Sequence, residues 1–138
     1  MRLVLDNNIL FSLMNPHSTN SYLFSLLKTE FLAPEFIKEE FEKYKSECLI
    51  KSKLSEHEFE IRQKEIEEQI EFFKSSEYKD FLKQTKDAIA DPDDIDFLAL
   101  ALSVNASIWS NDLHLKQQSL IKVFTTQELI EKLLKDEV

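Results

Sequence analysis

Acidic residues stand beside the ends of apolar runs in this sequence. Asp6 follows the apolar residues 3–5, Asp112 follows a second such run, and Asp94 stands just before the apolar segment 95–104. Short apolar runs are typical of parallel strands that are covered on both faces, and ligands bind at the carboxyl ends of such strands. We therefore expect these three carboxylates to meet at one edge of a parallel sheet.

Carboxylates that gather without a lysine or arginine beside them repel one another, and a divalent cation is the simplest partner that removes this repulsion. Asp91 and Asp93 are alternatives to Asp94, because the helix that follows is too evenly apolar for its periodicity to separate them. Each of these acids also has a simpler interpretation as a helix cap or a turn residue. Their common placement favours a metal site.

Glu40 is a fourth candidate, on a helix that we expect to begin near Pro34 and to run to about Cys48. The apolar positions on one side of that helix are Ile37, Phe41, Tyr44 and Cys48. Glu40 lies about 70° from the centre of that stripe, closer than the neighbouring glutamates, although a solvated charge is the alternative. Asn8 and Ser110 are placed to orient the carboxylates through hydrogen bonds.

The remaining pattern predicts a three-layer α/β/α fold with a short parallel sheet of four to five strands, in a single domain over residues 1–138. Strands are expected at 2–6, 31–33, 108–110 and 121–124. Helices are expected at 7–14, 18–28, 34–48, after a capping box at Ser55, at 78–89, 91–104, and after a second capping box at Thr125. Segment 70–73 either continues a helix or forms a short edge strand.

Composition excludes several classes of protein. The net charge of −9 argues against binding of nucleic acid by charge alone. The sequence has no glycine, which excludes phosphate-binding glycine loops. The apolar runs are too short to cross a membrane, and residues 6–8 interrupt any signal peptide, so a cytoplasmic protein is expected. Cys48, the only cysteine, allows no intramolecular disulfide and is expected in the core.

Other catalytic groups are less convincing. Zinc binding is disfavoured by one cysteine and three scattered histidines, and these histidines lack a nucleophile partner. Four lysines are candidates for phosphate contacts, but they alternate with glutamates and so favour a solvated helix face: Lys43, Lys45, Lys51 and Lys53.

Taken together, these motifs resemble the PIN-domain family, in the compact prokaryotic form that includes VapC-type toxins. The resemblance spans nearly the whole chain. It rests on residues 3–10, on Ala33-Pro34-Glu35 with Glu40 six residues after the proline, on residues 91–94 followed by Ala99 and Ala101, and on residues 108–112. One departure is His114, where the family often has another acidic residue.

The resemblance implies a Mg²⁺- or Mn²⁺-dependent ribonuclease, with Asp6, Glu40, Asp94 and Asp112 as catalytic residues. We expect Asp6 and Asp94 to be the principal ligands and Asp112 to bind the same or a second ion, with Glu40 as a ligand or a base that orients water. An RNA substrate and an antitoxin partner follow from the same resemblance, and a homodimer is expected as well. The alternatives are a non-catalytic PIN-like module that binds RNA or protein, and a phosphatase with Asp6 as nucleophile.

Overall fold

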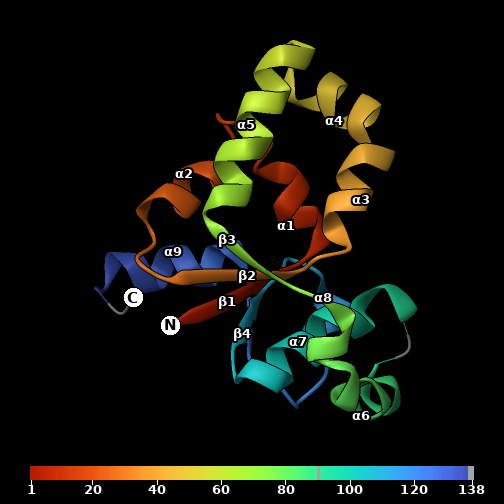
Figure 1. Cartoon of the computed structure of the whole chain (residues 1–138). Helices are drawn as coiled ribbons and strands as arrows, with labels where there is room; N and C mark the ends of the chain where they lie inside the picture. Colours follow the sequence, from red (N-terminus) through yellow and green to blue (C-terminus); the bar gives the residue numbers. More distant parts are fainter. Residues whose placement is uncertain (90, 137–138) are drawn as a thin grey trace.

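The computed structural model describes residues 1–89 and 91–136, and a five-stranded parallel sheet runs through its centre (Figure 1). The strand order across the sheet is β3-β2-β1-β4-β5, and every neighbouring pair is parallel. The strands are β1 (Arg2–Leu5), β2 (Glu30–Pro34), β3 (Ile70–Phe73), β4 (Ser107–Trp109) and β5 (Val123–Phe124). The sheet confirms the expected parallel α/β class.

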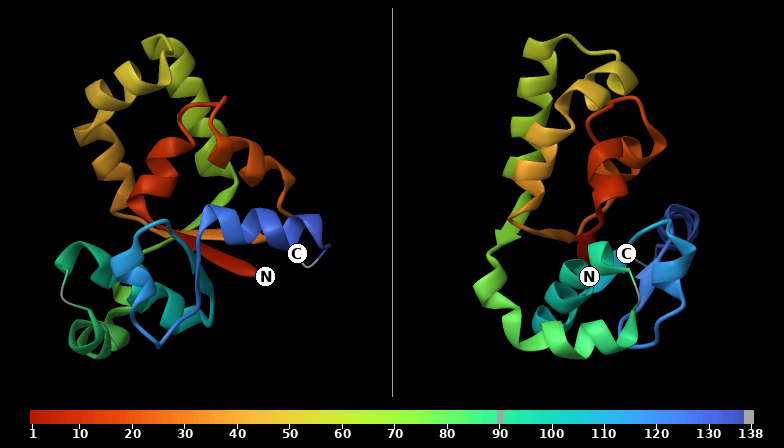
Figure 2. Two further views of the ribbon diagram at one scale, coloured as in Figure 1. Left: turned by 180° about the vertical axis from the view of Figure 1, so that it is seen from behind. Right: turned by 90° about the vertical axis from the view of Figure 1, so that its right-hand side faces the viewer.

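Helices cover both faces of this sheet (Figures 1 and 2). One face carries α1 (Asn7–Ser12), α2 (Thr19–Leu26), α3 (Ile37–Lys43), α4 (Lys45–Ser52), α5 (Glu56–Glu68) and α9 (Thr126–Leu134). The other face carries α6 (Leu82–Ala88), α7 (Ile95–Val104) and α8 (Leu113–Lys116). Short 3-10 turns connect these elements: η1 (Ser75–Glu77), η2 (Lys79–Phe81) and η3 (Pro92–Asp94). The three-layer α/β/α arrangement is therefore confirmed.

Alternate residues of the central strand contribute to two separate cores. Leu3 and Leu5 pack with the helices of one face, and Val4 packs with those of the other. All three side chains are completely buried. Because successive strand residues point to opposite faces, a strand that is covered twice must be apolar throughout.

The order of the strands creates a switch point between β1 and β4. The chain moves from β1 outward to β2 and β3, and then returns to the other side of β1 to form β4 and β5. Leu5 lies opposite Trp109 in the register, so both strands end at the same level. The two loops that follow these strands diverge here, and ligands of open α/β sheets bind at such a point.

Three expected elements differ in detail. The helix expected over residues 34–48 is two helices, α3 and α4, which are separated at Tyr44 (φ −105°, ψ 15°). Pro34 does not open a helix but ends β2, where it lies opposite Phe73. The last strand begins only at Val123, two residues later than expected. Of the two alternatives for segment 70–73, the structure has the edge strand, β3, and not a continued helix.

Within the described part of the chain, none of the helices has both the length and the apolar character that crossing a lipid bilayer requires. Cys48 is 7% exposed and packs in the core on the side of α1 to α5, as expected.

Candidate active site

Asp6 stands where β1 ends and α1 begins, and its carboxylate is held from two sides. The backbone N–H of Ile9 donates to its Oδ1 at 2.9 Å, and the hydroxyl of Ser110 donates to its Oδ2. The side chain is only 5% exposed. Burial raises the pKa of Asp6, while the hydrogen bonds from Ser110 and Ile9 act in the opposite direction. The carboxylate is thus fixed at the carboxyl end of the central strand.

Ser110 connects two of the candidate acids through one hydroxyl group. It is completely buried, donates to Asp6, and accepts a hydrogen bond from the backbone N–H of Asp112 at 3.0 Å. Asp112 in turn caps α8, because its Oδ1 accepts from the backbone N–H of His114 at 2.9 Å. The loop after β4 therefore has its geometry set by the same serine that orients Asp6.

Asp94 occupies the N-cap position of α7, yet its side chain makes no capping hydrogen bond. The capping role in this segment belongs to Asp91, whose Oδ1 accepts from the backbone N–H of Asp93 at 3.0 Å. The half-buried carboxylate of Asp94 is thus not engaged by its own helix. Asp91 and Asp93 are both exposed.

The three carboxylates of Asp6, Asp94 and Asp112 influence one another electrostatically. Burial is the main cause that raises the pKa of Asp94 to about 6, and the next is the negative charge of Asp112. The charges of Asp91 and Asp6 add to this effect. Asp112 also raises the pKa of Asp6. Residues far apart in the sequence are therefore brought into one acidic cluster at the switch point.

Glu40 lines an adjoining recess of about 340 Å³, together with Asn7 and Asp93, the sequence neighbours of Asp6 and Asp94. The recess is lined by Asn7, Asn8, Phe11, Phe36, Glu40, Lys43, Tyr44, Pro92, Asp93 and Asp96. Asn8 is exposed, and the hydrogen-bond donors to the Asp6 carboxylate among the described residues are Ile9 and Ser110. The structure thus unites three of the four acids and places Glu40 beside them.

One residue of this recess was missed by the sequence reasoning. Oδ1 of Asn7 is buried and has no hydrogen-bond partner among the described residues. The position of Asn7 directly after Asp6 was an available signal. Lys43, one of the four lysines considered as phosphate contacts, is the basic residue of the recess, whereas Lys45 is bound by Glu56 and Glu60, each at 3.1 Å.

A hydrogen-bond network around Thr126 holds the loop after β4 in place. The hydroxyl of Thr126 accepts from Trp109 Nε1 at 3.1 Å and from Asn111 Nδ2 at 2.9 Å, and donates to Oδ1 of Asn20 at 2.8 Å. Asn111 Oδ1 also accepts from the backbone N–H of Thr126 at 2.8 Å. Helices α2 and α9 are thereby tied to the segment that presents Ser110.

The donor atoms at this edge are suited to a hard dication. Carboxylate oxygens and an amide oxygen without a partner are the ligands that Mg²⁺ and Mn²⁺ prefer. In residues 1–89 and 91–136, no three His, Cys, Asp or Glu side chains are arranged to ligate an ion directly. Mg²⁺ takes only one or two carboxylates and retains several waters, so this set fits a hydrated ion.

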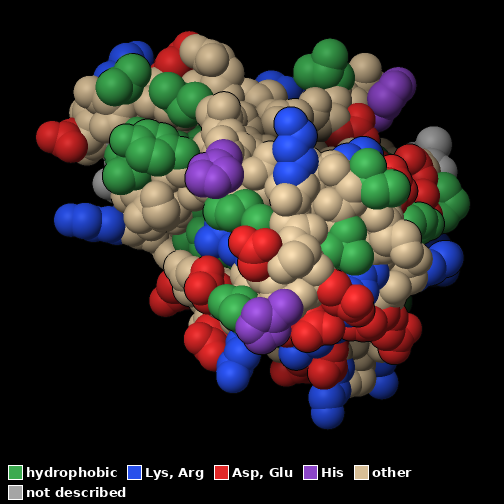
Figure 3. Space-filling view, turned by 90° about the horizontal axis from the view of Figure 1, so that it is seen from above, with side chains coloured by type: hydrophobic (Ala, Val, Ile, Leu, Met, Phe, Trp, Pro, Cys, Tyr) green, Lys and Arg blue, Asp and Glu red, His purple; other side chains and the backbone are tan. Residues whose placement is uncertain are grey.

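The surface around the helices α1 to α5 carries both signs of charge. On the face shown in Figure 3, the basic side chains are interspersed with acidic and polar ones. Together with the net charge of −9, this argues against a broad electrostatic surface for nucleic acid on that face.

Comparisons with known proteins agree with this architecture. A chain of VapBC2 from Rickettsia felis, solved bound to a DNA fragment from the promoter of that pair, superposes with a TM-score of 0.63 at 17% identity. The match covers 91% of this chain and 98% of that chain, and at this identity it shows a common fold. No curated protein matches the sequence. The sequence itself matches the PIN domain family over residues 4–134, a family whose members are generally nucleases. Because that match spans nearly the whole chain, the protein belongs to the PIN domain family.

Proposed function

We propose that this protein is a Mg²⁺- or Mn²⁺-dependent endoribonuclease that hydrolyses RNA phosphodiester bonds. The observation that carries the proposal is the gathering of three carboxylates at the switch point of a parallel sheet. Ser110 links Asp6 to the backbone of Asp112, and the charges of both acids contribute to the raised pKa of Asp94. Membership of a family of nucleases supports it. A phosphodiester resists attack because its oxygens are anionic, so a site for its hydrolysis requires a cation.

The side chains have separable roles in this proposal. A bound dication supplies positive charge for the phosphate oxygens and an activated water. Asp6 and Asp94 would hold the ion, and Asp112 would bind the same or a second ion. Ser110 keeps the Asp6 carboxylate in one orientation, which preserves the geometry that the ion needs. Glu40 orients water from the adjoining recess. In-line attack by water on phosphorus would form a new P–O bond and break the bond to the 3′ oxygen, which takes up a proton, so that the products are a 5′-phosphate and a 3′-hydroxyl.

The test is cleavage of single-stranded RNA by the purified protein with Mg²⁺ or Mn²⁺. Asp6→Asn keeps the shape of the side chain and removes its charge, so cleavage is expected to fall at least about 100-fold. Asp80→Asn is the matched control, since Asp80 is an exposed aspartate on η2 and is expected to have no effect. Equal cleavage by the wild type and Asp6→Asn would reject the proposal.

We further infer that the protein is the toxin of a VapBC-type toxin–antitoxin pair, acts in the cytoplasm and forms a homodimer. The fold that it shares with a chain of VapBC2 supports a protein partner. The test is growth of cells that express the wild type or Asp6→Asn. Arrest by the wild type alone is expected, and growth with both would reject the toxin role.

The second candidate is a non-catalytic PIN-like module that binds RNA or protein. Two observations favour it: the described side chains include no group of three placed for direct ligation, and His114 stands where the family often has an acid. Calorimetry separates the two candidates. Binding of Mn²⁺ in the millimolar range or tighter supports the nuclease, and its absence together with retained RNA binding supports the module.

A further inference from the structure

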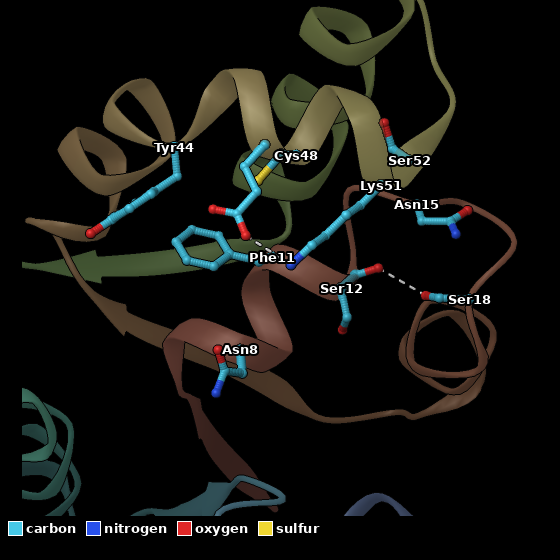
Figure 4. Close-up of a pocket in the computed structure, with 10 residues that line it drawn as sticks. Asn8, Phe11, Ser12, Asn15, Ser18, Tyr44, Cys48, Lys51 and Ser52 are labelled. Atoms are coloured by element: carbon cyan, nitrogen blue, oxygen red, sulfur yellow. Dashed lines mark hydrogen bonds and ion pairs between the residues drawn. The ribbon is translucent and has the colours of Figure 1, made fainter.

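Two hollows on the surface share part of their lining, and together they are called the groove here. One is the recess of Glu40, and the other is a cavity of about 460 Å³ between α1 and α4, which Figure 4 shows. The residues that line both are Asn8, Phe11 and Tyr44. In Figure 4 Tyr44 and Asn8 lie toward one end of the cavity, and Asn15 and Ser52 lie toward the other. Since α1 is the helix that Asp6 caps, the groove leads away from the acidic cluster.

Tyr44 presents an aromatic ring at the junction of the two hollows. It stands at the break between α3 and α4 and is 38% exposed. Its ring contacts Phe11 with centroids 5.9 Å apart, and Phe11 contacts the buried Phe41 at 5.4 Å. Nζ of Lys43 lies 5.5 Å from the centroid of the Tyr44 ring. The ring is therefore supported from the core and still open to solvent.

The charge of the protein determines which contacts with RNA can contribute affinity. A chain of net charge −9 gains little from the release of counterions, which normally supplies most of the affinity for nucleic acid. Stacking of a base on an aromatic side chain does not depend on net charge and tolerates any base. Tyr44 presents an exposed aromatic ring in the recess that Glu40 lines, and such a ring supplies this kind of contact.

We propose that Tyr44 is the platform on which a base of single-stranded RNA stacks, so that the strand lies in this groove and its phosphodiester reaches the acids. The inference rests on the proposed nuclease function and names how its substrate is positioned. Lys43 contacts the phosphate next to the stacked base. Lys51 contributes less, because its Nζ is held by Glu47 at 2.9 Å.

The lining of the groove favours RNA over a segment of protein. Five of the ten residues that line the cavity between α1 and α4 carry an amide or an aliphatic hydroxyl group: Asn8, Ser12, Asn15, Ser18 and Ser52. Such groups hydrogen-bond to the edges of unpaired bases. A docked protein helix is instead recognised by a groove of aliphatic side chains, and the apolar lining here consists of Phe11, Tyr44 and Cys48.

The test compares the steady-state cleavage of a single-stranded RNA by Tyr44→Ala, Tyr44→Phe and Tyr44→Trp in Mn²⁺. Tyr44→Ala is expected to raise KM about 5- to 100-fold, because loss of one stacked base has effects of that size. The value of kcat is expected to change less than about threefold, since Tyr44 does not touch the reacting phosphate. The phenylalanine and tryptophan variants retain the stack and are expected to keep the wild-type KM.

Tyr22→Ala is the matched control, because Tyr22 is 69% exposed on α2 and does not line the groove. Thermal melting of each variant checks that it is folded. A 2-aminopurine base in the RNA reports stacking directly, with fluorescence quenching that Tyr44→Ala abolishes. An unchanged KM and unchanged quenching in folded Tyr44→Ala would overturn the inference, as would equal damage by Tyr44→Phe.

The dependence on salt gives a second readout. With Lys43 as the main phosphate contact, the slope of log affinity against log salt is expected to be near −0.7. A slope steeper than about −2 would show that phosphate contacts dominate and would overturn the stacking account.

Absence of cleavage by the wild type would reject the proposed function, whereas the quenching experiment would still decide the role of Tyr44. If Tyr44→Ala lost binding to a protein partner but bound RNA as the wild type does, the groove would be assigned to a protein and the inference overturned.

Discussion

Asp94→Asn is expected to stabilise the metal-free protein. The pKa of the Asp94 carboxyl is raised to about 6 from its ordinary value of 3.8 by burial and by the charges of Asp112, Asp91 and Asp6. The folded protein therefore binds this proton more tightly than the unfolded chain does, and stability falls as pH rises from about 4 to above 6. Asparagine is neutral at every pH, so the variant does not lose stability through ionisation of this side chain.

The magnitude follows from the displacement of the pKa. A displacement from 3.8 to about 6 corresponds to about 3 kcal/mol at most. Because the side chain is partly exposed, solvent screening reduces the expected gain to about 1–2 kcal/mol at pH 7.5. In a chain of this size such a gain raises the Tm by roughly 3–8 °C. Well below pH 3.8 the difference in stability is expected to vanish, since the carboxyl is then protonated in both the folded and the unfolded state.

The assay is urea unfolding of the wild type and Asp94→Asn at several pH values, with a chelator present. Asp80→Asn, on an exposed aspartate in η2, is the control and is expected to show no gain. Equal free energies of unfolding for the wild type and Asp94→Asn at pH 7.5 would refute the reasoning, because they would mean that neither burial nor the neighbouring negative charges disfavour the ionised Asp94 carboxylate.

Two further predictions concern hydrogen bonds that hold the site and the fold. Ser110→Ala removes a buried hydroxyl that donates to Asp6 and accepts from the N–H of Asp112. The variant is expected to lose about 1–3 kcal/mol of unfolding free energy, measured in urea, and to cleave RNA about 10- to 100-fold more slowly. Cleavage at the wild-type rate would contradict the role given to Ser110. Thr125→Ala removes the N-cap of α9, whose hydroxyl accepts from the N–H of Glu128 at 3.2 Å, and is expected to cost about 1 kcal/mol without loss of cleavage, which the same two assays check.

The parts of the fold that could be predicted from the sequence are those fixed by local patterns. The apolar run that ends at Asp6 predicted the central strand, and burial of that strand on both faces explains why the run is so clear. The capping boxes at Ser55 and Thr125 predicted the starts of α5 and α9, and both are present. These signals lie within a few residues, so no tertiary contact was needed to read them.

The errors arose where tertiary contacts decide. Pro34 looked like the first residue of a helix, but β1 pairs with β2 only as far as Leu32, so a proline without an N–H is tolerated at the end of β2. The break at Tyr44 has no glycine or proline to announce it. Next to the break, Lys45 forms ion pairs with Glu56 and Glu60 of α5. These contacts exist only once the chain has folded, so the sequence pattern could not show them.

The candidate site was predicted as a set of acids, while their partners were only partly foreseen. Ser110 was expected to orient a carboxylate, and the structure places its hydroxyl against Asp6 and the N–H of Asp112. Glu40 was expected among the acids, and it lines the adjoining recess instead. Its placement was inferred from one continuous helix, so the break that follows it altered the surroundings that the periodicity implied. The catalytic role of Glu40 stays a prediction.

Calorimetric titration of Mn²⁺ into the wild type and into Asp6→Asn, Asp94→Asn and Asp112→Asn is the most direct test of shared binding by these carboxylates. If these acids together hold one ion, the wild type is expected to bind Mn²⁺, and each of the three variants is expected to lose at least about tenfold in affinity for Mn²⁺. The control Asp80→Asn is expected to keep the wild-type affinity. Wild-type affinity retained in all three variants, or no binding by the wild type at millimolar Mn²⁺, would contradict it.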